Sequence, residues 1–270
     1  MTTSRSDAPR TPQTRVAVGS RRGGARFAGM LLAALLILAG CGGGTAAASQ
    51  QPSPTATVKP TVVYVALGAS DAIGVGADNP NTQGYVPRII ARLPKGISAA
   101  LNLGVSGILI HDALTQELPD ALTAHPTLVT VWLVGNDFKG CTPLNQYASD
   151  LDTLLTQLHN STSAQVFVGN APDMSALPYF KDGGALAAGS CFKGLTTTAI
   201  QMMAEQWNAA INPLVARHGD VLVDLFNSDL ASHPEYVSAT DGFHPSSAGY
   251  ARLADLFWAQ ITAHHAVPGM

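Results

Sequence analysis

Apolar residues recur along the chain in five short runs that are nearly continuous rather than alternating with polar residues. The runs are Val62–Leu67, Ile97–Leu103, Leu128–Val134, Gln165–Gly169 and Val221–Phe226. Such runs are typical of parallel strands buried on both faces of a sheet. Segments with apolar residues at helical spacing lie between and after these runs, and they predict helices at Gly84–Leu93, Leu109–Leu122, Leu144–His159, Thr196–His218 and Ser246–Ala263.

The alternation of strands and helices predicts an α/β protein. We expect a three-layer α/β/α sandwich around a parallel sheet of about five strands. The alternating region, residues 61–265, has about 200 residues, which is enough for one domain with a substantial core. Residues 266–270 form a short tail.

The N-terminal 60 residues have a different pattern. A cluster of arginines at residues 21–26 precedes an apolar run, Phe27–Leu38, and the chain then reads LAGC at residues 38–41. An apolar run this short is typical of an export signal rather than of a membrane-spanning helix. The LAGC ending resembles the lipobox of bacterial lipoproteins, which implies that residues 1–40 are removed and Cys41 is lipidated. The alternatives are an ordinary cleaved signal peptide and an uncleaved anchor, and both would still export the protein.

Residues 41–60 are mostly small and polar, with several prolines. This composition is typical of a flexible linker. We therefore expect a protein that is held at the extracytoplasmic face of a cell membrane by the lipid on Cys41.

The charge of the chain excludes one class of partner. The whole chain carries 15 Lys and Arg against 18 Asp and Glu, a net charge of −3, but residues 1–40 hold six of the arginines and only one acid. The remainder has nine basic and 17 acidic residues, a net charge of −8. So acidic a protein lacks the basic surface that binds nucleic acid. It also gains little from anionic lipid headgroups, so membrane attachment depends on the lipid anchor.

Two cysteines, Cys141 and Cys191, follow Cys41 in the sequence. An even pair in an exported domain favours a disulfide, and the alternative is two unpaired thiols. The bond would hold the Gly- and Ala-rich insertion that follows Asp173 and ends at Gly194 near Cys141. We expect that segment to shape the substrate pocket.

Four short blocks follow predicted strands or precede the last helix. They read GAS at 68–70, NLGVSG at 102–107, GND at 135–137 and DGFH at 241–244. Because ligands bind beyond the carboxyl ends of parallel strands, we expect the four blocks to meet in one site at that edge of the sheet.

Three side chains in these blocks have the chemistry of nucleophilic ester hydrolysis. Ser70 follows the first strand, at a predicted strand-to-helix turn where a helix N-terminus would favour negative charge. Asp241 and His244 are three positions apart, which on a tight turn lets the carboxylate accept from Nδ1–H while Nε2 stays free for Ser70. Taken singly, Ser70 could equally be a helix N-cap, and Asp241 could cap a turn beside a surface histidine.

The order and spacing of the four blocks resemble the SGNH hydrolases, a branch of the GDSL-type lipases and esterases. The resemblance covers essentially the whole domain and implies a flavodoxin-like fold with a catalytic triad of Ser70, His244 and Asp241. The family motif reads G-D-S, whereas Ala69 stands in the second place here. That acid is not a member of the family's triad, so the departure weakens the match only slightly.

The resemblance also implies an oxyanion hole. Its donors would be the amide of Ser70, the amide of Gly104 and the side-chain amide of Asn136. Glycine lets a backbone approach the substrate closely, and an Asn amide is a donor that does not titrate. Taken singly, Gly104 could be a turn glycine and Asn136 the cap of an Asx-turn.

Other chemistries lack their motifs in this chain. The sequence has no G-x-S-x-G elbow, no H-E-x-x-H and no Cys/His cluster at zinc spacing. We expect neither a metal nor an organic cofactor.

The sequence therefore predicts a monomeric serine esterase that forms an acyl-enzyme on Ser70. The substrate would be a small-molecule or glycan ester, and short acyl chains are what family members of this size often accept. One alternative is a cell-envelope polysaccharide deacetylase or acyltransferase that uses the same site. The other is a catalytically silent lipoprotein whose fold serves binding.

Overall fold

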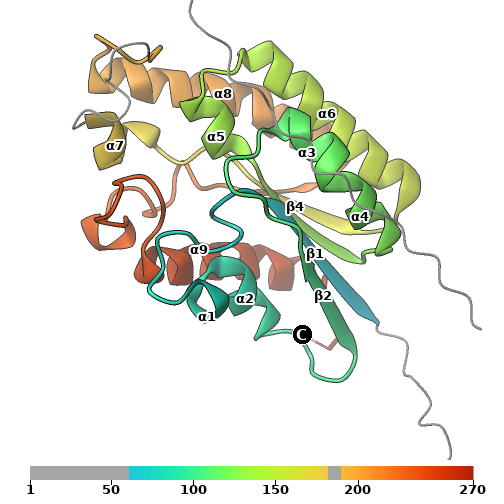
Figure 1. Ribbon diagram of the computed structural model, residues 1–270. Helices are drawn as coiled ribbons and strands as arrows, with labels where there is room; N and C mark the ends of the chain where they lie inside the picture. The colour runs from blue at the N-terminus through green and yellow to red at the C-terminus, as the bar shows by residue number, and fades with distance from the viewer. Residues whose placement is uncertain (1–60, 182–189, 270) are drawn as a thin grey trace, which may run out of the picture. The chain divides into compact units, whose positions relative to one another are not determined.

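The computed structural model describes residues 61–181 and 190–269. The predicted signal at 1–40, the lipidation site Cys41 and the linker at 41–60 lie outside the described residues. The described part is a parallel sheet with helices on both faces, which confirms the predicted fold class (Figure 1).

The sheet has β3 at its centre, with β1 and β4 on either side. The strands are β1 (Val62–Gly68), β2 (Ser98–Asn102), β3 (Leu128–Trp132), β4 (Gln165–Gly169) and β5 (Val221–Val223), in the spatial order β2-β1-β3-β4-β5 and all parallel. Val65 of β1 is in register with Leu101 of β2 and Val129 of β3. Because β1 lies between two strands, the loops that follow β1, β2 and β3 end side by side.

Two layers of helices cover the sheet (Figure 1). One layer holds α1 (Pro80–Gln83), α2 (Tyr85–Ile90) and α9 (Ser247–Ala263). The other holds α3 (Ile110–Gln116), α4 (Leu118–Thr123), α6 (Leu144–Ser161) and α8 (Thr197–His218). Short elements follow the strand ends, namely α5 (Val134–Lys139), the 3₁₀ turns η1 (Met174–Ala176) and η2 (Pro234–Tyr236), and α7 (Pro178–Lys181).

Local sequence fixes where the long C-terminal helices begin. The side chain of Thr196 accepts a hydrogen bond from the amide of Ala199 at 3.2 Å and caps α8. The hydroxyl of Ser246 caps α9 by accepting from the amide of Gly249, also at 3.2 Å. Such caps satisfy amides that have no partner within the helix. The second cap sets the end of the loop that carries Asp241 and His244.

Three local predictions differ from the structure. The expected helix at 109–122 is divided into α3 and α4 at Glu117, and Pro119 lies in the first turn of α4, where its missing N–H costs nothing. The chain from Val134 is helical rather than strand. Strand β2 is at an edge of the sheet and is mostly exposed, so it is not buried on both faces. None of the described helices is long and apolar enough to cross a bilayer.

Candidate active site

Ser70 lies in a series of tight turns and not at the start of a helix, contrary to expectation. The amide of Val75 donates to the Ser70 carbonyl at 2.9 Å, and the amide of Gly74 donates to the Asp71 carbonyl at 3.1 Å. Gly74 and Gly76 have φ angles of +83° and +98°. These left-handed conformations suit glycine and interrupt a right-handed helix.

The structure brings Ser70, His244 and Asp241 together in the predicted order. Oγ of Ser70, a buried residue, lies 2.7 Å from Nε2 of His244. On the other side of the ring, Nδ1 of His244 lies 2.5 Å from Oδ2 of Asp241. An ionised carboxylate can only accept, so Nδ1 carries the proton and Nε2 accepts from the Ser70 hydroxyl. This arrangement can take a proton from the serine.

Asp241 is held as an anion by its neighbours. Its Oδ1 accepts from the amides of Phe243 at 2.9 Å and His244 at 3.0 Å. Partial burial acts to raise the pKa of Asp241, but the hydrogen bonds from the His244 ring and the two amides outweigh it and lower that pKa below its usual range. The carboxylate is therefore ionised at neutral pH and fixes the orientation of the imidazole.

The loop that carries His244 packs closely on the turn that carries Ser70. A Cβ atom at Gly76 would lie 2.5 Å from the carbonyl oxygen of Pro245 and 3.0 Å from Cβ of His244. Only glycine allows this approach. The hydroxyl of Tyr250, on α9, donates to the carbonyl of Val75 at 2.6 Å and ties the same turn to the last helix.

Asn136 lies in the first turn of α5 and is buried. Its Nδ2 donates to the carbonyl of Ile108 at 3.0 Å, which uses one of its two N–H groups. The next residue, Asp137, accepts from the amide of Ile110 at 2.8 Å, and burial raises the pKa of Asp137 to about 6. Both side chains tie α5 to residues 108–110 at the start of α3. Asp137 therefore orders the site and is not part of the hydrogen-bonded series of Ser70, His244 and Asp241.

Gly104 packs against the turn that carries Ser70. A Cβ at this position would lie 2.6 Å from Cβ of Ala72 and 3.0 Å from the carbonyl oxygen of Ala69. The amide of Gly104, however, donates to Oδ1 of Asn102 at 3.1 Å. The donor expected to face the substrate thus already has a partner in this structure.

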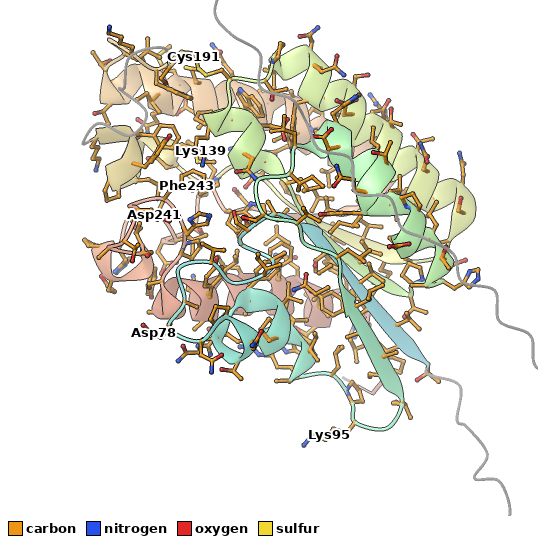
Figure 2. The ribbon with its side chains drawn as sticks, viewed as in Figure 1. Asp78, Lys95, Lys139, Cys191, Asp241 and Phe243 are labelled. Atoms are coloured by element: carbon orange, nitrogen blue, oxygen red, sulfur yellow. A yellow bond between two sulfur atoms is a disulfide. The ribbon has the colours of Figure 1, made fainter. Side chains whose placement is uncertain are left out.

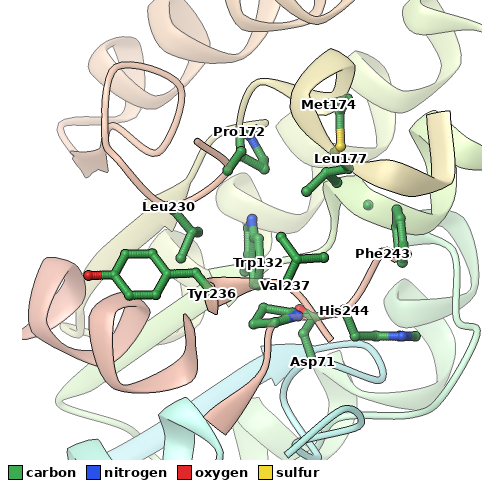
Figure 3. A pocket seen from close by; sticks show the side chains of 13 residues that line it. Asp71, Trp132, Pro172, Met174, Leu177, Leu230, Tyr236, Val237, Phe243 and His244 are labelled. Atoms are coloured by element: carbon green, nitrogen blue, oxygen red, sulfur yellow. The ribbon is translucent and has the colours of Figure 1, made fainter. Parts of the chain in front are cut away.

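An apolar pocket opens beside His244 (Figure 3). Its walls come largely from the loops after β4 and β5 and include Pro172, Met174, Leu177 and Leu230, and Trp132 lies between them. Met174 and Leu177, at the start of the insertion that follows Asp173, therefore contribute to the pocket, as expected, whereas residues 182–189 lie outside the described residues.

One acidic side chain belongs to the lining of this pocket, that of Asp71. Figure 3 shows Asp71 below Trp132 and Val237 and beside His244. Burial raises the pKa of Asp71 to about 7. A polar group thus lies at one side of an otherwise apolar cavity.

A disulfide and a cluster of aromatic side chains hold α5 in place. Cys141, just after α5, is bonded to Cys191, as expected from the sequence, and Figure 2 shows Cys191 near α8. Phe192 is fully buried, and its ring centroid lies 5.3 Å from that of Phe138 and 5.0 Å from that of Phe180. The bond therefore anchors the segment whose aromatic side chain packs on α5, the helix that carries Asn136.

A lysine lies at the rim of the site. Nζ of Lys139 is 4.7 Å from the ring centroid of Phe243 and 5.5 Å from that of Tyr179 (Figure 2). These are cation–π distances, and they fix Phe243 against the pocket. Within residues 61–181 and 190–269, no group of three His, Cys, Asp or Glu side chains is placed to hold a metal ion.

Serine hydrolases use a serine, a histidine and a carboxylate that are hydrogen-bonded in series. Here the three side chains lie at the carboxyl edge of a parallel sheet, where ligands bind in such folds. Comparison with known families assigns the class more closely. The chain belongs to the GDSL-like lipase/acylhydrolase family, whose model matches residues 72–252. This confirms the resemblance to SGNH hydrolases found in the sequence. No curated protein sequence matches the chain.

Solved structures share the fold at low identity. An extracellular lipase from Streptomyces rimosus is 21% identical, with a TM-score of 0.54, over 74% of this chain and 99% of that one. A lipase/acylhydrolase from Enterococcus faecalis is 22% identical, with a TM-score of 0.55, over 75% of this chain and 96% of that one. A catalytic mutant of Axe2, an acetylxylan esterase from Geobacillus stearothermophilus, is 16% identical, with a TM-score of 0.57, over 76% of this chain and 96% of that one.

Proposed function

We propose that this protein hydrolyses carboxylic esters through an acyl-enzyme on Ser70. The observation that carries the proposal is the hydrogen-bonded series from Ser70 Oγ to His244 Nε2, at 2.7 Å, and from His244 Nδ1 to Asp241 Oδ2, at 2.5 Å. The Ser70 oxygen attacks the ester carbonyl carbon while its proton passes to Nε2 of His244. Asp241 stabilises the imidazolium that forms.

The remaining steps use the same groups. The tetrahedral intermediate collapses, the C–O bond to the alcohol breaks, and the leaving alkoxide takes the proton from His244. Water then attacks the acyl-enzyme, gives its proton to His244 and releases the acid as the proton returns to Ser70. All residues in this scheme come from one chain, so a monomer is sufficient.

The negative oxygen of each intermediate needs hydrogen-bond donors. We assign two of them to the amide of Ser70 and the Nδ2 group of Asn136. The third donor is an amide of the loop after β2. Gly104 can serve once its bond to Asn102 yields.

The pocket supports a short acyl chain. Its apolar walls suit a hydrocarbon group, but the carboxyl group of Asp71 forms part of the lining. A long chain would cover that group and remove it from water without giving it a partner, which costs free energy. We therefore propose acetyl to butyryl esters as the preferred substrates.

A second candidate function is the removal or transfer of acetyl groups on a cell-envelope polysaccharide. The observation in its favour is the likeness of the fold to an acetylxylan esterase. Product analysis separates transfer from hydrolysis. With p-nitrophenyl acetate and a xylo-oligosaccharide present together, an esterase releases only acetate, whereas a transferase also gives an acetylated sugar.

The test of the proposed function is the hydrolysis of p-nitrophenyl acetate by the wild type and by Ser70→Ala. Turnover that disappears in the variant, with unchanged circular dichroism, is the expected result. Equal rates in the two proteins would overturn the assignment of the nucleophile. An inactive wild type that still binds xylo-oligosaccharide would favour a binding role.

We further propose that the domain works outside the cytoplasm, attached through lipid on Cys41. The support is the LAGC sequence at 38–41 and the linker that follows. The full-length wild type should partition with the membrane fraction and label with a fatty-acid probe. Cys41→Ala should lose the label, and retention of the label would refute the anchor.

A further inference from the structure

Glu117 is a fully buried acid beneath the site, at the break between α3 and α4. Its Oε2 accepts a hydrogen bond from the amide of Gly68 at 3.1 Å. Gly68 ends β1, two residues before Ser70, and Val105 directly follows Gly104 in the loop after β2. Glu117 therefore fixes the end of β1 beneath the place where these two backbone segments meet.

The two segments also touch one another directly. The amide of Val105 donates to the carbonyl of Gly68 at 3.2 Å. A Cβ at Gly68 would lie 2.7 Å from Cβ of Ala72, and a Cβ at Gly104 would lie 2.6 Å from the same atom. The junction has no spare room, so a change in the Glu117 contact would shift the Ser70 turn against the loop.

A buried carboxyl group at this position costs free energy. Oε1 of Glu117 has no hydrogen-bond partner among the described residues, and an unpartnered buried polar atom is costly. Burial raises the pKa of Glu117 to about 8, so the group is mostly a neutral acid at pH 7. Leucine would fill the space without that cost, but it would release the amide of Gly68.

Other titratable groups face Glu117. Asp71, on the turn after β1, raises the Glu117 pKa further through its charge. The hydroxyl of Tyr85, on α2, is buried and has no hydrogen-bond partner among the described residues. Burial raises the pKa of Tyr85, and the charges of Tyr64, Asp71, Tyr250 and Glu117 raise it further.

We propose that Glu117 is a positioning residue that holds the turn carrying Ser70 and the loop after β2 in the relative placement that catalysis requires. It acts through the amide of Gly68, whose carbonyl in turn accepts from the amide of Val105, and it does not touch the substrate. The inference rests on the proposed function, because its effect is measured as reactivity of Ser70. Small errors in the placement of reacting groups have large effects on rate.

Two substitutions separate this role from simple packing. Glu117→Gln keeps an oxygen that accepts from Gly68, whereas Glu117→Leu fills the space without an acceptor. With p-nitrophenyl acetate, we expect Glu117→Leu to lower kcat by about 10–100-fold with KM within about twofold. Glu117→Gln should keep at least about half of kcat. Glu205→Leu, which replaces an exposed acid on α8, is the matched control and should behave as wild type.

The pH profile adds a readout that packing alone would not change. As Glu117 ionises, a buried negative charge appears beneath the oxyanion site and opposes the transition state. The wild-type kcat should therefore fall as pH rises through about 8, and Glu117→Gln should lack that fall. The titration of Asp71 remains in both proteins.

The rate at which a fluorophosphonate labels Ser70 gives a second measure of its placement without an ester substrate. Wild-type kcat and labelling rate in a folded Glu117→Leu protein would overturn the role of Glu117 alone. If Glu117→Leu does not fold, a Glu117→Gln protein that folds but is equally inactive would also overturn it. A wild type that neither labels nor hydrolyses esters would overturn the proposed function, and the role of Glu117 with it.

Discussion

Oγ of Ser70 lies 2.7 Å from Nε2 of His244, although 174 positions separate the two residues. Ser70 follows the first strand and His244 precedes the last helix, so the contact joins the two ends of the domain. The close approach of Gly76 to Pro245 sets the spacing between the two loops. The pair can act only as a unit, because the hydroxyl is a weak nucleophile without its base.

Substitutions of Ser70 and His244 should lower the activity non-additively. Ser70→Ala, His244→Ala and the double variant should each lower kcat/KM for p-nitrophenyl acetate by at least about 10³-fold, and by similar factors. His233→Ala is the control, because this exposed histidine pairs with Glu235 and does not contact Ser70. A double variant whose loss equals the product of the single losses would contradict the pairing.

Replacing Asn136 tests the oxyanion donor. Asn136→Asp keeps the shape of the side chain but removes its N–H groups, so kcat should fall by about 10²–10³-fold with little change in KM. The control is Asn208→Asp, which loses a comparable buried bond to the carbonyl of Ala171. We expect the control to lower the thermal midpoint while kcat stays within about threefold. Equal kcat losses in the two variants would point to a structural effect only.

Asp71→Leu should lengthen the preferred acyl chain. Removing the carboxyl group makes the pocket lining wholly apolar at that point, and each methylene buried there is worth about 0.8 kcal/mol. The ratio of kcat/KM for p-nitrophenyl octanoate to that for the acetate should therefore rise by at least about tenfold. Asp120→Leu, at an exposed position on α4, should leave the ratio unchanged. A ratio that does not respond to Asp71→Leu would show that the acyl chain of the substrate binds elsewhere.

The disulfide should stabilise the fold measurably. Cys141 and Cys191 are 50 positions apart, and closing a loop of that length is worth about 4 kcal/mol by chain-entropy reasoning. The double variant Cys141→Ser, Cys191→Ser should lose a free energy of unfolding of this order in urea titrations. The wild type treated with a reductant should match the variant. A loss below about 1 kcal/mol would mean that the aromatic packing around Phe192 holds this segment without the bond.

Buried acids should make stability fall as pH rises from about 5 to 8. The pKa of Glu117 is raised from 4.5 to about 8 in the folded protein, so the folded state binds more protons than the unfolded state within that window. The resulting stability is fully present below the unfolded pKa and is lost as pH rises through the folded pKa. Asp137, whose pKa is about 6, acts in the same direction.

Chemical unfolding at pH 5 and pH 8 measures this linkage. The wild type should lose more free energy of unfolding between the two than Glu117→Gln does, with a limit of about 1.4 kcal/mol per pH unit for one group. Asp241 has a lowered pKa, so its contribution is lost only as pH falls through the acid range, outside this window. Parallel curves for the two proteins would show that Glu117 does not titrate there.

Much of the architecture could be predicted because its signals are local. Continuous apolar runs mark the strands, and the blocks after them lie at one edge of the sheet by topology alone. The start of α5 is not evident in the sequence, because Leu133 and Val134 extend the apolar run of β3 and read as strand. Glu117 resembles an ordinary helix acid in the sequence, and its burial and its bond to Gly68 depend on contacts between residues far apart in the chain. The partner of the Gly104 amide likewise depends on the conformation of the loop.

The order of the strands places part of the acyl-binding wall on a loop that carries no residue of the triad. Met174 and Leu177 come from the loop after β4, whereas Ser70 follows β1 and Asn136 follows β3. Leu230 shares the connection after β5 with His244, so that part of the wall is tied to the catalytic base. Acyl-chain preference can therefore change through the loop after β4 while the reacting groups stay in place.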